Sequence, residues 1–173
     1  VYDQVVTING VSKAFAMTGW RLGYIGAPLW IANACTKIQG QFTSGASSIS
    51  QRAAIAAVSA DPSVTHQMRE AFRSRRELVL TELNKIHGVK TNVPEGAFYV
   101  FPDISFFFGK SDGKITINNA DDLSLYILNK VNVALVTGAA FGAPKCLRIS
   151  YAASDQELKK ALERIEKALS LLS

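Results

Sequence analysis

Apolar and polar residues in the first third of the chain alternate between strand-like and helix-like spacings. A β-branched run at 5–8 that ends in Asn9-Gly10 predicts a strand followed by a turn. Residues 20–27 predict a second strand, and Pro28 opens a predicted helix that reaches about residue 39. An alanine-rich helix is predicted from about 49 to 60 after a serine-rich loop. This region therefore predicts a strand pair followed by two helices.

The middle of the chain carries signals for one long helix. Asp61 can cap its first turn and Pro62 suits the first helical position, so the helix is predicted to begin there. Gly88 is predicted to end it. The expected buried face consists of Val64, Met68, Phe72, Val79, Leu83 and Ile86.

Short strands and helices follow one another in the remaining residues. Strands are predicted at 97–102, 133–136 and 146–151, and a helix at 119–131, with a loop from 104 to 118. Ser154 and Glu157 have the spacing of a capping box and predict the start of a last amphipathic helix. The pattern as a whole predicts an α/β protein, with a compact α+β unit after residue 61.

Composition narrows the class of protein. The chain has 173 residues with 48% hydrophobic and 19% charged residues, and no apolar run reaches the ~20 residues of a membrane span. The net charge of +5 is dispersed except for four arginines on the long predicted helix, so we expect neither nucleic acid nor membrane as a partner. Cys35 and Cys146 lack metal-type spacing, are expected to be buried, and favour a reducing, cytoplasmic setting.

Candidate chemistry is concentrated in the connection between the first two predicted strands. Lys13 lies there among small residues, and Arg21 follows eight positions later. A lysine amine can condense with an aldehyde, and an arginine fork fits a pair of phosphate oxygens. Pyridoxal phosphate carries both groups, although a single loop lysine is most often only a solvated surface residue.

The whole string 12–24, SKAFAMTGWRLGY, closely resembles the pyridoxal-phosphate attachment site of class I aminotransferases of fold type I, in the aspartate aminotransferase branch. The resemblance implies that Lys13 attaches the cofactor and that Arg21 holds its phosphate. Many relatives carry a phosphate-binding serine three positions before the lysine, where this sequence has Gly10. Ser12 is a candidate for replacing that serine in part.

A second candidate residue lies near the other end of the chain. Arg148 sits in the alternating strand 147–152, where an arginine is most often solvated or paired with a nearby acid. Its planar fork can also bind a carboxylate with two hydrogen bonds. The resemblance implies that Arg148 binds the substrate α-carboxylate, and that the segments 94–99 and 136–142 are further landmarks of the family.

The resemblance covers essentially the whole chain, but only the C-terminal part of the family. It implies that 1–60 form the end of the large cofactor-binding domain and 61–173 the small domain. The implied activity is amino-group transfer between an amino acid, expected to be aspartate or glutamate, and a 2-oxo acid, in a homodimer when the protein is full length. Alternatives are an aromatic or prephenate aminotransferase, a carbon–sulfur lyase of the same fold, or a non-catalytic dimerisation or interaction fragment.

Several groups that such an enzyme needs have no counterpart in this sequence. Relatives hold the pyridine nitrogen with an aspartate, contact the ring oxygen with a tyrosine and an asparagine, and stack an aromatic residue on the ring. These residues come from the preceding part of such chains. Because the aspartate tunes the cofactor as an electron sink, we expect this chain alone to be inactive or nearly so.

Overall fold

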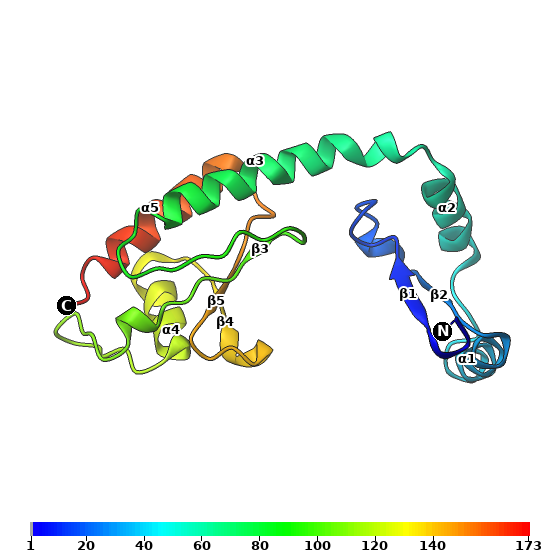
Figure 1. Cartoon of the computed structure of the whole chain (residues 1–173), viewed down its shortest axis with the longest axis horizontal. Helices are drawn as coiled ribbons and strands as arrows, with labels where there is room; N and C mark the ends of the chain where they lie inside the picture. Colours follow the sequence, from blue (N-terminus) through cyan, green and yellow to red (C-terminus); the bar gives the residue numbers. More distant parts are fainter. Residues whose placement is uncertain (1) are drawn as a thin grey trace. The chain divides into compact units, whose positions relative to one another are not determined.

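A computed structural model describes residues 2–173 of the chain (Figure 1). Its contacts divide the chain into two compact units, Val1–Gln67 and Met68–Ser173. The division falls seven residues after the domain boundary that the sequence predicts at 60/61. The assignment of the two parts to a large and a small domain stays a prediction.

The first unit contains the predicted strand pair and both predicted helices. The strands β1 (Thr7–Gly10) and β2 (Gly23–Gly26) are antiparallel, with Asn9 opposite Tyr24. They start later than the predicted runs at 5–8 and 20–27, and short 3-10 helices precede them at Tyr2–Gln4 and Thr18–Trp20. The helices follow as α1 (Leu29–Phe42) and α2 (Ser48–Ser59), and the Ser47 hydroxyl accepts a hydrogen bond from the N–H of Ser50.

Burial in the first unit is sparse. Val11, Ser50 and Ala54 are buried, whereas no residue of α1 is. The expectation that Cys35 is buried is therefore wrong, since this α1 residue is exposed, and Cys146 is only partly buried. An apolar stripe needs a partner surface, and within this unit nothing buries the stripe of α1. Large apolar side chains consequently remain exposed on the unit, among them Ile8, Leu29, Trp30, Phe42 and Ile49.

The long helix starts later and ends earlier than predicted. Asp61 caps a 3-10 turn, Pro62–Thr65, by accepting a hydrogen bond from the N–H of Ser63, and α3 then runs over His66–Leu83. Residues 84–88 form turns, and Gly88 adopts a positive φ of +87°. On the predicted buried face, Val79 and Leu83 are buried, but Val64 is exposed because it lies in the 3-10 turn.

The second unit holds a three-stranded antiparallel sheet in the order β3-β5-β4. The strands are shorter than predicted: β3 is Tyr99–Val100, β4 is Val136–Thr137 and β5 is Leu147–Ser150. The helices α4 (Ala120–Val131) and α5 (Asp155–Leu169) match their predicted positions closely, and the Ser154 hydroxyl accepts a hydrogen bond from the Glu157 N–H, which is one of the two hydrogen bonds of a capping box. The predicted loop 104–118 contains the 3-10 helix Ser105–Phe107.

One hydrophobic core joins the helices and strands of the second unit (Figure 1). It combines Val79 and Leu83 of α3, Leu123 of α4 and Leu162 of α5 with the inner face of the sheet. Alternate residues of β5 contribute to that face, since Leu147 and Ile149 are buried. The mixed α/β architecture and the compact α+β unit that the sequence predicts are thereby confirmed. None of the helices in the described part of the chain is both long and apolar enough to cross a membrane.

The loop that leads into α4 is fixed by one carboxylate. Asp112 accepts hydrogen bonds from the N–H groups of Lys114 and Ile115 at 3.1 and 3.0 Å, and from the Lys130 ammonium group at 3.0 Å. Its side chain is only 6% exposed. The Ile115 N–H, together with Lys130 and the Lys114 N–H, lowers the pKa of Asp112 from 3.8 to about 2.

We expect this carboxylate to make the stability of the chain sensitive to acid. A carboxyl group with a lowered folded-state pKa stabilises the fold above its unfolded pKa, and this contribution is lost as the pH falls through the folded value. The loss should occur between pH 3.8 and about 2. Urea unfolding across this window should show a stability difference between the unsubstituted chain and Asp112→Asn that shrinks as the pH falls. A constant difference would contradict the assignment, and Asp121→Asn, at an exposed aspartate of α4, serves as the control.

Candidate active site

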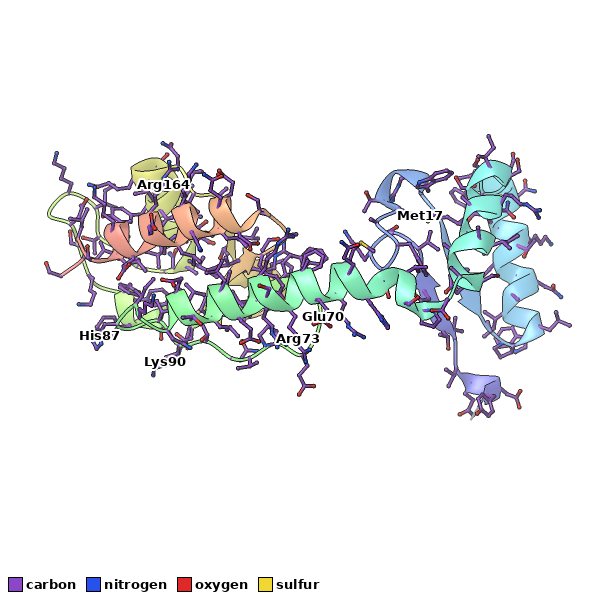
Figure 2. The ribbon with its side chains drawn as sticks, turned by 90° about the horizontal axis from the view of Figure 1, so that it is seen from above. Met17, Glu70, Arg73, His87, Lys90 and Arg164 are labelled. Atoms are coloured by element: carbon purple, nitrogen blue, oxygen red, sulfur yellow. The ribbon has the colours of Figure 1, made fainter. Side chains whose placement is uncertain are left out.

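The residues predicted to hold the cofactor lie in the loop between β1 and β2. Ser12 is half-buried, and Lys13 and Arg21 are exposed. The Lys13 carbonyl accepts a hydrogen bond from the Ala16 N–H at 3.2 Å, which closes the loop into a turn just after the lysine. Because the strands at both ends are paired, the loop has fixed entry and exit points (Figure 2, where Met17 of this loop is labelled).

Two residues of this loop have a left-handed backbone conformation, which is unfavourable for residues other than glycine. Ala16 has a φ of 53° and Arg21 a φ of 51°, both in the left-handed region. A residue other than glycine in this region costs about 1–3 kcal/mol, and such residues cluster at functional sites. The Arg21 guanidinium also donates a hydrogen bond to the Thr18 carbonyl oxygen at 2.9 Å. The backbone and this hydrogen bond together fix where the Arg21 side chain leaves the loop.

The donor groups of the loop suit the predicted cofactor. Lys13 supplies an amine for an aldehyde, Arg21 supplies a guanidinium for a phosphate, and Ser12 supplies a hydroxyl donor. Gly10 stands where many relatives have a serine. Its α-carbon lies close to β2, since a side chain there would approach the Leu22 carbonyl oxygen to 3.3 Å. The residues present therefore fit pyridoxal phosphate, with Ser12 as the hydroxyl nearest in sequence to Lys13.

Arg148 lies on β5, in the second unit. Its neighbours Leu147 and Ile149 point into the core, so the pleat places Arg148 on the opposite face of the sheet. Val136 of β4 is its partner across the sheet, and Tyr99 of β3 pairs with Ser150. The alternation of apolar and polar residues at 147–150 thus places the Arg148 guanidinium on one face of β5 and the buried side chains on the other.

Two aromatic rings contact the Arg148 guanidinium. Its central carbon lies 4.5 Å from the ring centroid of Tyr99 and 4.5 Å from that of Phe141. Among residues 2–173, no carboxylate forms an ion pair with Arg148. Pairing with a nearby acid, one of the two ordinary roles of a strand arginine, is therefore not observed among these residues. The Arg148 guanidinium remains able to bind an external carboxylate.

The sequence indicated the segments that carry these two rings, but not the rings as site residues. Tyr99 ends the landmark segment 94–99, and Phe141 lies in the landmark segment 136–142. The signal that could have identified them was an aromatic residue in each of these two landmark segments. The structure groups Ser12, Lys13 and Arg21 in the first unit, and Arg148, Tyr99 and Phe141 in the second.

A separate groove of about 650 Å³ lies in the second unit and contains none of the predicted site residues. It runs between α3 and the turn at 94–97 and is lined in part by Arg73, Arg76 and Tyr151. The Tyr151 hydroxyl donates to the Ala97 carbonyl oxygen at 3.1 Å, and burial raises the pKa of this tyrosine. Glu70 forms an ion pair with Arg73 (Figure 2), and Arg76 donates to the Pro94 carbonyl oxygen. Internal contacts therefore already engage Glu70, Arg73 and Arg76 in this groove.

Sequence comparison places this site in a known context. The sequence model described as aminotransferase class I and II matches residues 1–165. A bifunctional aspartate aminotransferase and glutamate/aspartate-prephenate aminotransferase from Petunia hybrida is 53% identical over 98% of this chain and 36% of its own length. An aspartate aminotransferase from Rhizobium meliloti (strain 1021) is 46% identical over 99% of this chain and 42% of its own. The chain thus spans roughly two fifths of the length of these relatives.

Solved structures show the same relationship. The crystal structure of the aspartate aminotransferase from Rhizobium meliloti superposes with a TM-score of 0.96 at 44% identity, covering 99% of this chain and 43% of that one. An aromatic aminotransferase from Pyrococcus horikoshii superposes with a TM-score of 0.86 at 37% identity, covering 98% of this chain and 44% of that one. The chain belongs to the class I and II aminotransferase family, and its fold is part of the fold of these enzymes.

Proposed function

We propose that this chain is the C-terminal part of a pyridoxal-phosphate-dependent aminotransferase that transfers an amino group between an amino acid and a 2-oxo acid. The observation that carries the proposal is the presence, in a member of this family, of a lysine amine and an arginine guanidinium in suitable positions. A lysine lies in a strained loop on a strand pair, and an arginine free of ion pairs within residues 2–173 lies on β5. The family match over residues 1–165 supports it.

Each residue has a distinct task in the proposed reaction. When bound, pyridoxal phosphate supplies an electron sink for the substrate Cα–H bond. The Lys13 amine would hold the cofactor through its aldehyde and, once released, would take the proton from the Cα of the amino acid and give a proton to the Cα of the 2-oxo acid. Arg21 holds the phosphate, with Ser12 as a further donor, and Arg148 binds the substrate carboxylate through its planar fork.

We propose aspartate or glutamate as the amino donor, since the relatives from Petunia hybrida and Rhizobium meliloti are named as aspartate or glutamate/aspartate-prephenate aminotransferases. An aromatic or prephenate aminotransferase is the second candidate, favoured by the prephenate activity named for the Petunia relative. The full-length protein is proposed to be a homodimer. Its cytoplasmic localisation stays a prediction.

The proposed activity should appear only when the missing groups are supplied. We expect the isolated 173-residue chain to transaminate aspartate with 2-oxoglutarate at no more than background rate. A chimera in which this chain replaces the matching C-terminal 43% of the Rhizobium meliloti enzyme should be active, because the folds superpose with a TM-score of 0.96. Steady-state kinetics of both proteins with added cofactor provides the measurement. Turnover by the isolated chain within tenfold of the chimera would refute the need for the missing groups, and a folded but inactive chimera would refute the proposed function.

A further inference from the structure

The surroundings of Arg148 contain more than a site for a carboxylate. A guanidinium is a flat group, and its hydrogen-bond donors point outward in its own plane. Rings on the faces therefore leave the edges open, and a carboxylate bound through two parallel hydrogen bonds needs such an edge. The central carbon of the Arg148 guanidinium lies over the rings of Tyr99 and Phe141, 4.5 Å from each centroid, within the distance at which a cation is attracted to the face of an aromatic ring.

Both rings are held by elements that the core fixes. Tyr99 belongs to β3, whose other residue, Val100, is fully buried, and its ring also contacts Phe98 at a centroid distance of 4.3 Å. Phe141 ends the 3-10 helix Gly138–Phe141. Its ring is nearly perpendicular to that of Phe101, with the two centroids 6.1 Å apart. Continuing the β3–β5 register places Phe101 opposite Arg148. Rings and arginine therefore share one face of the sheet.

This arrangement has an energetic consequence for the arginine. An unstacked guanidinium on a surface samples many rotamers, and ordering it on binding costs free energy. Contact with two rings restricts the rotamers of the group beforehand and takes water away from it, which strengthens its attraction to an anion. Arg148 would thus enter the encounter with a carboxylate already oriented.

We propose that Tyr99 and Phe141 are positioning residues that hold the plane of the Arg148 guanidinium, so that one edge remains available to the substrate carboxylate. This inference rests on the proposed function, because it assigns the carboxylate to a substrate. Neither ring is proposed to take part in proton transfer. Their effect is on the affinity of the site for carboxylates and on the order of the arginine.

Nuclear magnetic resonance of the full 173-residue chain tests the proposal. The Nε–H signal of Arg148 is assigned by its loss in Arg148→Lys, its order is measured by ¹⁵N relaxation, and its shift is followed on titration with 2-oxoglutarate. In Tyr99→Leu and in Phe141→Leu the order of the Nε–H group should fall and the Kd for 2-oxoglutarate should rise roughly two- to tenfold. Tyr99→Phe, which keeps the ring, should behave like the unsubstituted chain.

A matched control separates positioning from general packing. Phe106 is an exposed aromatic residue under a different cation, with the Lys110 ammonium nitrogen 4.7 Å from its ring centroid. Because the rings over which Arg148 lies are those of Tyr99 and Phe141, Phe106→Leu should leave both readouts unchanged. Binding that depends on Arg148 but is unchanged in Tyr99→Leu and Phe141→Leu would overturn this inference alone. A chain whose binding of 2-oxoglutarate does not depend on Arg148 would overturn the carboxylate role in the proposed function, and this inference with it.

Discussion

Replacing Lys13 by alanine is expected to abolish amino-group transfer in the chimera with the Rhizobium meliloti enzyme. Lys13 is proposed to supply both the covalent attachment of the cofactor and the base that moves the substrate proton. Positioned acid–base groups alone contribute about 10²–10⁴-fold, so we expect kcat to fall by at least this factor. The measurements are kcat for aspartate and, by mass spectrometry, the pyridoxyl group fixed to the protein by borohydride.

A second lysine of the same unit provides the comparison for this result. Lys37 lies on α1 and is exposed, so Lys37→Ala should keep both the activity and the reducible attachment. Residual activity of Lys13→Ala within tenfold of the unsubstituted chimera would end the assignment of Lys13 as base and attachment point. Attachment that persists at another residue in Lys13→Ala would contradict the attachment role specifically.

Gly138→Ala is expected to produce a large loss of stability in the second unit. A β-carbon on Gly138 would lie 2.2 Å from the carbonyl oxygen of Ala143 and 2.5 Å from that of Cys146, both backbone atoms that cannot rotate away. The residue also donates a hydrogen bond to Cys146 at 2.7 Å and accepts one from Ala143 at 3.0 Å. Overpacking costs about 1–3 kcal/mol and each lost hydrogen bond about 0.5–1.5 kcal/mol. With two hydrogen bonds lost, we therefore expect a loss of about 2–6 kcal/mol.

The same substitution should also reduce the order of the Arg148 guanidinium, although Gly138 is not one of the residues that contact it. Gly138 begins the 3-10 helix that carries Phe141, so moving this helix away from β5 should remove one ring from the guanidinium. Urea unfolding monitored by circular dichroism measures the stability, and the Arg148 Nε–H signal reports on the ring. Gly96→Ala is the control, because no atom lies within 4 Å of a β-carbon placed there. Equal unfolding midpoints for the two variants would contradict the prediction that a β-carbon at position 138 destabilises the second unit.

Local chemistry explains which elements could be predicted from the sequence. The capping pair Ser154 and Glu157 and the alternation around Arg148 are contained within a few neighbouring residues, and the structure confirms both. The boundaries of the strands and of α3 were less accurate, because pairing partners and 3-10 turns decide where a ladder or a helix begins. Val64 illustrates this, since its apolar side chain fits the helical stripe but belongs to the turn before α3.

Long-range contacts explain what the sequence could not reveal. Tyr99 and Phe141 come from segments 42 positions apart, since 141 − 99 = 42, and only the β3–β5 pairing and the turn at Gly138 bring both onto Arg148. Burial of α1 failed as a prediction for a related reason. Periodicity shows that a helix has an apolar side, but it does not supply the surface that would cover Cys35.

The contrast in burial between the two units implies unequal local opening. Free energies of local opening range from near zero in poorly packed segments to the global value in a core. Arg148 lies on a strand whose neighbouring residues are packed into a core from three helices, whereas Lys13 lies on a two-stranded ribbon in a unit with few buried residues. In the 173-residue chain we therefore expect the backbone that carries Lys13 to exchange its amide hydrogens with solvent more readily than the backbone that carries Arg148.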